Sequence, residues 1–338
     1  MRSFVPSKLG WRVAFGGALL FLGAGLVTAA ALSWGEKEAP PYQRRVVTDK
    51  PDDKLAALAA LKPGAAIETF DIAVPDATER AARGTVLRDA DGSAAVVAWE
   101  STIGEPVLYQ DISPDEERGL IEILRKHLPA DAMVLAMPDT SRRLKAFMAI
   151  DAPLAAADDS ATRMLPAPWQ RQADVVRAEE RRVMGIKSGA GAAALNDFLD
   201  AMLADDRYGV ARLQIMARGR PAYVILHVRD AFSIGIARPD RLAIGIHDFP
   251  AGSQVHDALK LVRHWMKEKG HAAYVAIPKA KDVTRVFFLP DAKDKSTLLT
   301  RLLPFSAADL GSVAGTHLVY QHRGYWLYQL VPVADRPS

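Results

Sequence analysis

Histidine and carboxylate side chains are the residues of this sequence whose types could do chemistry. Seven of its eight histidines lie after residue 226. Two adjacent pairs, His247-Asp248 and His256-Asp257, offer the nitrogen and oxygen ligands that metal sites use. Their spacing matches no established metal-binding motif, and no His-Glu-x-x-His is present. These four residues are the candidate metal ligands. Local hydrogen bonding at a strand end and a helix start is the alternative.

Cysteine-dependent chemistry is excluded, because the 338 residues contain no cysteine. This rules out thiol nucleophiles, thiolate zinc sites, iron–sulfur clusters and haem attached through Cys-x-x-Cys-His. The Gly-x-Ser-x-Gly elbow and phosphate-binding loops are absent from the sequence as well. We therefore expect no catalytic residue and no bound cofactor.

Aromatic residues near the C-terminus suggest recognition of another protein. On a strand, Trp326 and Tyr328 share one face and Tyr325 lies on the other. Aromatic side chains of this kind anchor protein interfaces, and a place in the core is the alternative. The candidate partner-binding residues are Tyr320, His322, Tyr325, Trp326 and Tyr328.

The hydrophobic spacing predicts that helices and strands of an α+β fold position these residues. Apolar residues at helical spacing indicate helices at 55–61 and 192–203. Ser113, Pro114 and Glu116 form a capping-box arrangement at the start of another helix. The predicted strands are 67–74, 85–88, 94–100, 133–137, 210–217, 222–229, 232–237, 242–249 and 273–277, followed by a hairpin of 317–321 with 325–333.

An internal duplication organises these elements. Four blocks match in the same order: 92–99 with 219–226, 120–128 with 258–266, 136–138 with 276–278, and 162–166 with 300–304. The matches predict two α+β modules with mostly antiparallel sheets. We expect a first repeat at 55–168, a linking helix at 169–190 and a second repeat at 191–333. The charges at 177–182, mixed in sign, indicate a solvated face on that linking helix.

The first residues predict a transmembrane helix. Residues 13–32 carry no charge, and about 20 apolar residues cover the roughly 30 Å hydrocarbon core of a bilayer. Basic residues in 1–12 place the N-terminus in the cytoplasm and the remainder in the periplasm. We expect a single-pass inner-membrane protein with the span at 13–33 and a linker at 34–54. A cleaved signal peptide is the alternative.

The charge balance argues against nucleic acid as a partner. Lys and Arg number 43 against 40 Asp and Glu, so the formal net charge is only +3. This falls short of the basic stripe expected of a nucleic-acid-binding protein.

The layout resembles that of the HaoB-like hydroxylamine-oxidation accessory membrane proteins, which occur with multihaem hydroxylamine oxidoreductases. The resemblance is carried by the span at 13–32, an exported region of roughly 300 residues, and the ending Gly-Tyr-Trp-Leu-Tyr-Gln-Leu at 324–330. It implies a c-type cytochrome or redox enzyme as partner, and a role in that partner's assembly, anchoring or electron handling. It carries over no functional residues.

Two hypotheses of function follow. The first is a non-enzymatic, membrane-anchored periplasmic accessory protein that binds or helps assemble a partner. The second is an exported metal-dependent hydrolase with a His/Asp site in the second repeat.

Overall fold

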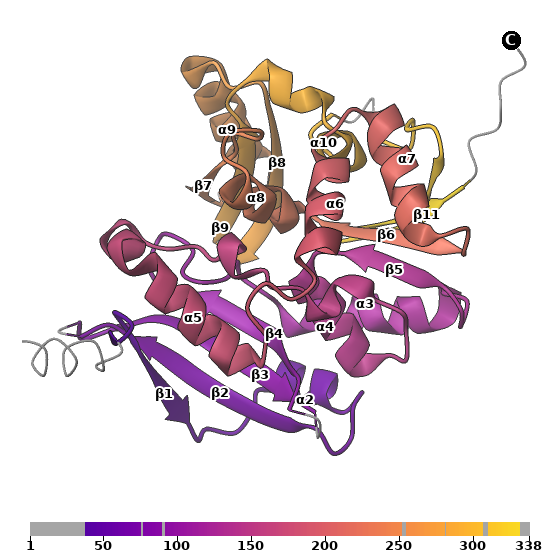
Figure 1. The fold of residues 1–338 in the computed structure, drawn as a ribbon. Coiled ribbons are helices and arrows are strands. Elements are labelled where there is room, and N and C mark those ends of the chain that lie inside the picture. Colours follow the sequence, from indigo (N-terminus) through magenta and orange to yellow (C-terminus); the bar gives the residue numbers. More distant parts are fainter. Residues whose placement is uncertain are drawn as a thin grey trace, which may run out of the picture. The chain divides into compact units, whose positions relative to one another are not determined.

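Figure 1 shows the chain as a computed structural model, which describes the backbone of residues 38–75, 77–89, 92–251, 255–280, 282–306 and 310–331, and the side chains of all of these except 255–257 and 280. Met1–Pro40 and Pro41–Ser338 are two separate compact units, and the fold below is that of the second. The predicted span at 13–33 lies outside the described residues. Among those described, no helix combines the length and apolar character needed to cross a bilayer.

The first sheet is antiparallel and takes its strands from the start of the second unit. Its order is β1 (Gln43–Val47), β2 (Ala66–Ala73), β3 (Arg80–Arg88) and β4 (Ala94–Ser101). The strands predicted at 67–74, 85–88 and 94–100 are confirmed. The linker predicted at 34–54 is wrong in part, because β1 lies within it. β1 is the edge strand and pairs with β2 from Gln43, opposite Ala73, to Val47, opposite Thr69.

Three helices lie between the first sheet and the second. They are α2 (Asp53–Ala59), α3 (Pro114–His127) and α4 (Pro138–Phe147). The side chain of Asp52 caps α2 by accepting a hydrogen bond from the Leu55 N–H. Leu120, Ile121 and Leu124 recur on one face of α3 and are buried. α4 was not predicted, because its polar residues (Thr140 to Arg143) hide the apolar period.

The second sheet joins strands from both predicted repeats. Its order is β10 (Thr316–His322), β11 (Tyr325–Leu330), β6 (Ala222–His227) and β5 (Met133–Ala136). β5 pairs with β6 in parallel, whereas the other pairs are antiparallel. The expectation of one self-contained sheet per repeat at 55–168 and 191–333 is therefore wrong. The predicted hairpin of 317–321 with 325–333 is confirmed as β10 and β11.

Helices replace two of the strands predicted in the second half. The segment after the linking helix α5 (Ala173–Met184) folds as α6 (Ala192–Met202), α7 (Asp206–Ala217) and α8 (Val228–Ala237). The strands predicted at 210–217 and 232–237 are thus wrong. Asp205 caps α7 and His227 caps α8, so the local hydrogen bonding favours helices at both places.

A third, antiparallel sheet follows, with α9 packed on it. Its order is β7 (Gly245–Pro250), β9 (Val283–Leu289) and β8 (Ala273–Ala280); the helices are α9 (Val255–Lys269) and α10 (Leu298–Leu302). The order of α9 and β8 parallels that of α3 and β5, as two of the matched blocks require. Upstream the halves differ, because α7 precedes β6 where β3 precedes β4.

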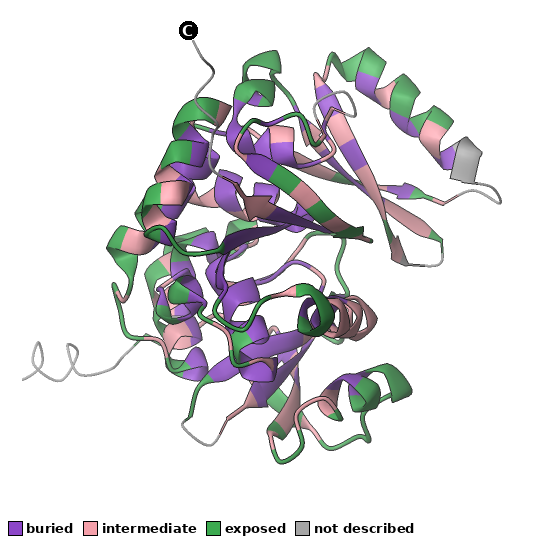
Figure 2. Ribbon diagram, turned by 90° about the vertical axis from the view of Figure 1, so that its right-hand side faces the viewer, coloured by how far each residue is buried: buried purple, intermediate pink, exposed green. Residues whose placement is uncertain are grey.

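Buried apolar clusters fill the spaces between these layers. One lies between the first and second sheets around α3 and α4, and another lies between the second and third sheets around α6, α7 and α10. Figure 2 shows the buried residues concentrated on the strands and the inward helix faces. These two clusters hold the first and third sheets in place on either side of the second.

Candidate functional site

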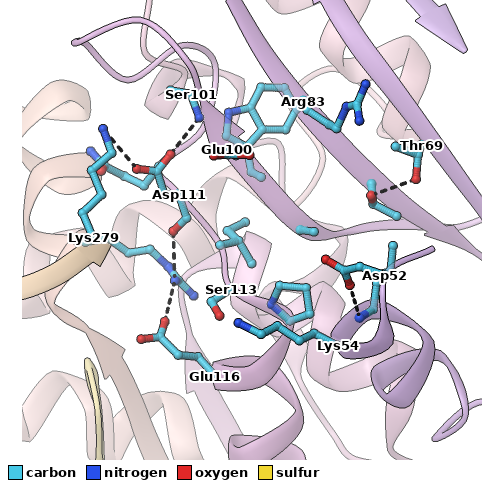
Figure 3. A pocket seen from close by; sticks show the side chains of 18 of the residues that line it. Asp52, Lys54, Thr69, Arg83, Glu100, Ser101, Asp111, Ser113, Glu116 and Lys279 are labelled. Atoms are coloured by element: carbon cyan, nitrogen blue, oxygen red, sulfur yellow. Dashed lines mark hydrogen bonds and ion pairs between the residues drawn. The ribbon is translucent and has the colours of Figure 1, made fainter. Parts of the chain in front are cut away.

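A cleft of about 460 Å³ lies between the first and third sheets (Figure 3). Its size falls in the range typical of ligand pockets. One wall is the face of the first sheet on which α2 and α3 also pack, and the opposite wall is the end of the third sheet. The floor is formed by the start of α3 and by the junction of β6 with α8. The segment from β1 to α2 forms the rim.

The wall on the first sheet is polar because neighbouring strands present polar residues side by side on this face. Thr85 lies opposite both Thr69 and Ala98, and Arg83 lies opposite Glu100. The two threonine hydroxyls are 3.0 Å apart. Arg83 donates two hydrogen bonds, of 2.7 and 2.9 Å, to Asp71. The apolar end of this face is covered by α2 and α3, so only its polar end lines the cleft.

On the opposite wall, two cations and two carboxylates neutralise one another. Arg285 donates to Asp248 at 2.7 and 2.8 Å and to Asp111 at 2.9 Å. Lys279 donates to Asp248 at 3.1 Å. Burial raises the pKa of Asp248, but Arg285 and Lys279 outweigh burial and hold this pKa below its ordinary value. Asp111 also accepts from the Ser101 N–H, which ties this wall to β4.

The floor begins at the first turn of α3. The helix starts at Pro114 as predicted, but the Ser113 side chain caps no N–H group, so the predicted capping box is wrong. Glu116 reaches outward instead, and its Oε2 lies 3.7 Å from His227 Nε2. Burial raises the pKa of Glu116, but the contact with His227 and the charge of Arg229 outweigh burial and hold this pKa at about 2.

His227 has a structural task at the end of β6. Its Nδ1 accepts a hydrogen bond from the Arg229 N–H, while Asp230 accepts from the His227 N–H; together they form a capping box for α8. Burial and the charge of Arg229 lower the pKa of His227 to about 4, despite the opposing effect of Glu116. The imidazole is therefore neutral at pH 7, and Nε2 carries the proton.

Below the floor, a buried ion network joins four elements. Glu117 accepts from Arg143 at 2.8 Å and from Arg229 at 2.7 Å. Tyr325 contacts both Glu117 and Arg229. Glu117, Arg143 and Tyr325 are each at most 1% exposed. Sequence spacing does not predict this network, because its members are spread over α3, α4, α8 and β11.

Three residues around the cleft have a buried side-chain N–H group without a hydrogen-bond partner in the described protein: Trp99, Gln110 and His227. Their N–H groups do not share one site. The Trp99 indole packs over Gly84, on the face of the first sheet away from the cleft, and His227 Nε2 faces the Glu116 carboxylate.

The structure separates the predicted metal ligands. His247 and Asp248 are adjacent on β7 and point to opposite faces. His247 stacks on Trp265 with ring centroids 4.9 Å apart, whereas Asp248 is held by Arg285 and Lys279. His256 and Asp257 lie on α9, with side chains outside the described residues. Among the side chains that are described, no group of three or more His, Asp or Glu converges as a metal site would require.

The predicted aromatic surface is wrong for three of its five residues. Tyr325, Trp326 and Tyr328 are 1%, 8% and 0% exposed, because β11 is an inner strand of the second sheet. Tyr320 and His322 lie on the edge strand β10 and are half-buried, with ring centroids 6.2 Å apart. Alternating aromatic residues fit a strand buried on both faces as well as an exposed one.

The predicted solvated face at 177–182 is wrong for Glu180, which is 1% exposed. Its carboxylate accepts from Tyr42 at 2.6 Å, from Arg44 at 2.5 Å and from Tyr109 at 3.1 Å. This cluster fixes α5 against the first sheet, on the face away from the cleft.

Residues 9–330 match the family model of the HaoA-associated protein HaoB, so the chain belongs to the HaoB family. The members of this family are accessory proteins of hydroxylamine oxidation, associated with HaoA. No curated protein and no solved structure shows a significant match to the chain.

Proposed function

We propose that this chain is a non-enzymatic accessory protein, anchored in the inner membrane, whose periplasmic part binds HaoA, the hydroxylamine oxidoreductase. The observation that carries the proposal is the family match over 9–330. The residues at 13–33 supply the anchor, since their length and composition suit a bilayer span.

The cleft is suited to binding because its charged side chains are held in place by ion pairs and hydrogen bonds within the protein. Asp111 and Asp248 hold Arg285, Glu117 holds Arg229, and His227 caps α8. Side chains fixed by ion pairs and caps form a preorganised surface, and preorganisation lowers the entropic cost of association.

Recovery of the partner from native membranes tests this function. The full chain, tagged at its C-terminus, is solubilised in mild detergent and isolated, and the bound proteins are stained for haem. We expect a haem-containing HaoA band that is absent from a mock isolation with an untagged strain. Isolation of the chain without any haem-containing protein would contradict the proposal.

The anchor is tested separately by fractionation. We expect the full chain in the membrane pellet after a carbonate wash, and a chain whose residues 1–40 are replaced by a cleavable signal peptide in the periplasmic fraction. Release of the full chain by carbonate would contradict a retained span.

A further inference from the structure

The solvent-facing side of α9 carries an excess of positive charge. The helix contains four Lys or Arg residues and two acids. Lys260, Arg263 and Lys267 recur three and four residues apart and are exposed, so they form one basic ridge along the helix. Neither Arg263 nor Lys267 makes an ion pair with a carboxylate in the described part of the chain, and Glu268 is paired with Lys269.

The stability of the helix does not explain this basic ridge. On α3, by contrast, Arg118 pairs with Glu122 at 3.2 Å, an arrangement that stabilises a helix. Arg263 and Lys267 are like charges four residues apart, and such a pair destabilises a helix. The ridge is therefore a surface feature that the fold does not require.

An aromatic cluster lies beside the basic ridge. His247 of β7 is exposed and stacks on the half-buried Trp265 of α9, with ring centroids 4.9 Å apart. The rings of His271 and Phe288 lie 4.8 and 4.9 Å from that of Trp265. Tryptophan is enriched among the residues that dominate the binding energy of protein interfaces. Unpaired cations beside a fixed indole suit a protein surface that is rich in carboxylates.

The apolar face of α9 is used within the protein. Val262 and Met266 pack with Phe249 and Val286 of the third sheet. A helix that lies in a membrane interface needs its apolar face for the lipid. The observations therefore favour a protein partner over a lipid surface.

We propose that the basic ridge of α9 is a docking surface for an acidic face of HaoA, and that its charge increases the rate of association. The proposal rests on the proposed binding of HaoA. The third sheet, on which α9 packs, also forms one wall of the cleft, so one partner can contact both.

Reversal of charge tests the basic ridge. Arg263→Glu/Lys267→Glu reverses two of its charges. Arg171→Glu/Lys187→Glu makes the same change at exposed positions on either side of α5, which packs on β4 (Figure 1). The measurement is the association rate constant of the full chain with purified HaoA at about 0.05 M salt. We expect the ridge variant to associate about tenfold more slowly and the control to change less than about twofold.

Salt and a conservative variant test whether charge is the cause. The association rate of the wild type should fall about fivefold between about 0.05 and 0.5 M salt, and that of the ridge variant should not. Arg263→Lys/Lys267→Arg keeps both charges and should associate like the wild type. Thermal melts show that each variant is folded when its rate is measured.

A label on α9 distinguishes HaoA from lipid. Because the chain contains no cysteine, His264→Cys at an exposed position of α9 takes a fluorophore at one site. The labelled full chain is placed in nanodiscs of neutral or anionic phospholipid and quenched with acrylamide. We expect HaoA to shield the label in neutral nanodiscs. Shielding by anionic lipid without HaoA would overturn the proposal in favour of a membrane surface.

The outcomes separate the inference from the proposed function. If the wild-type chain binds HaoA and the ridge variant associates at the same rate, the basic ridge is not a docking surface and the inference is overturned, while the function stands. If the wild-type chain does not bind HaoA, both are overturned.

Discussion

At the residue scale, Glu117 is the centre of the buried ion network below the cleft. This carboxylate is fully buried, and it pairs with Arg143 and Arg229 below the cleft. Burial raises its pKa, but the two guanidinium groups outweigh burial and keep the pKa below its ordinary value. The acid therefore stays ionised, and its removal would leave two buried cations with too little negative charge.

We predict that Glu117→Gln lowers the free energy of unfolding by about 3–5 kcal/mol, the usual cost of breaking a buried ion pair. Urea denaturation measures the loss. Glu122→Gln, which removes an exposed partner of Arg118 on the same helix, is the control and should cost less than about 1 kcal/mol. Equal losses for the two variants would contradict the assigned role of Glu117.

His227 makes stability depend on pH. Its pKa is about 4 in the folded protein and 6.5 ordinarily, so between these values the unfolded chain binds a proton that the folded chain does not. The contribution of His227 to stability should therefore fall as the pH drops from 6.5 to 4, by roughly 3 kcal/mol at most.

The variant His227→Asn tests this dependence, because Asn can still cap α8 but does not titrate. We expect the difference in unfolding free energy between wild type and variant to change across pH 4–6.5 and to be constant above pH 7. Asp230, whose pKa burial raises to about 6, has the opposite effect in both proteins and largely cancels in the comparison. A difference that is flat across the whole range would contradict a buried, neutral imidazole.

The site residues show what the sequence could and could not predict. The absence of cysteine excludes thiol chemistry from composition alone. The partners of Glu116 and Glu117 could not be foreseen, because Arg143, Arg229 and Tyr325 come from distant parts of the chain. His247 and Asp248 looked like a pair in the sequence, yet strand alternation turns them apart.

At the scale of elements, the close pairing of β3 and β4 depends on one glycine. Gly84 lies opposite Trp99, and a Cβ atom there would come within 2.5 Å of the indole ring and 2.9 Å of Phe70. The indole packs over the glycine on the face of the first sheet away from the cleft.

We predict that Gly84→Ala destabilises the protein by about 1–3 kcal/mol through overpacking. Gly104→Ala is the matched control, since a Cβ at this exposed loop position meets no atom within 4 Å. Thermal or urea unfolding measures both variants. An unchanged stability for Gly84→Ala would mean that the packing of Trp99 on β3 is looser than described.

Local signals predicted most of the elements, and the errors have physical causes. Helix α3, the strands β2 to β4 and the final hairpin were recognised from spacing and turns. The segments at α7 and α8 contain β-branched and aromatic residues, which favour strands. The caps at Asp205 and His227 stabilise helices there instead. β1 carries few apolar residues, and its pairing with the edge of β2 is a tertiary effect.

At the scale of the whole molecule, the parallel pair of β5 and β6 links the two halves. A parallel pair needs a long crossover, and here the crossover runs from α4 through α7. Neither half can complete the second sheet alone. The sequence matches between the halves suggested separate modules, but an alignment of blocks does not reveal which strands pair.

We predict that Pro41–Ser338 unfolds in a single cooperative transition. Far-ultraviolet circular dichroism and tryptophan fluorescence should give coincident urea curves, because the second sheet and the Glu117 network cross between the halves. Two resolved transitions would indicate independent modules and contradict the shared sheet.

Association with HaoA through the cleft is tested most directly by the affinity of the purified full chain for HaoA in mild detergent. Two variants are measured beside the wild type: Ala98→Trp, which places a large side chain on the first-sheet wall of the cleft, and Ala193→Trp, which places it on the exposed start of α6. The prediction is a saturable complex for the wild type and Ala193→Trp, and at least tenfold weaker binding for Ala98→Trp. No binding by the wild type, or the same Kd for all three chains, would contradict it.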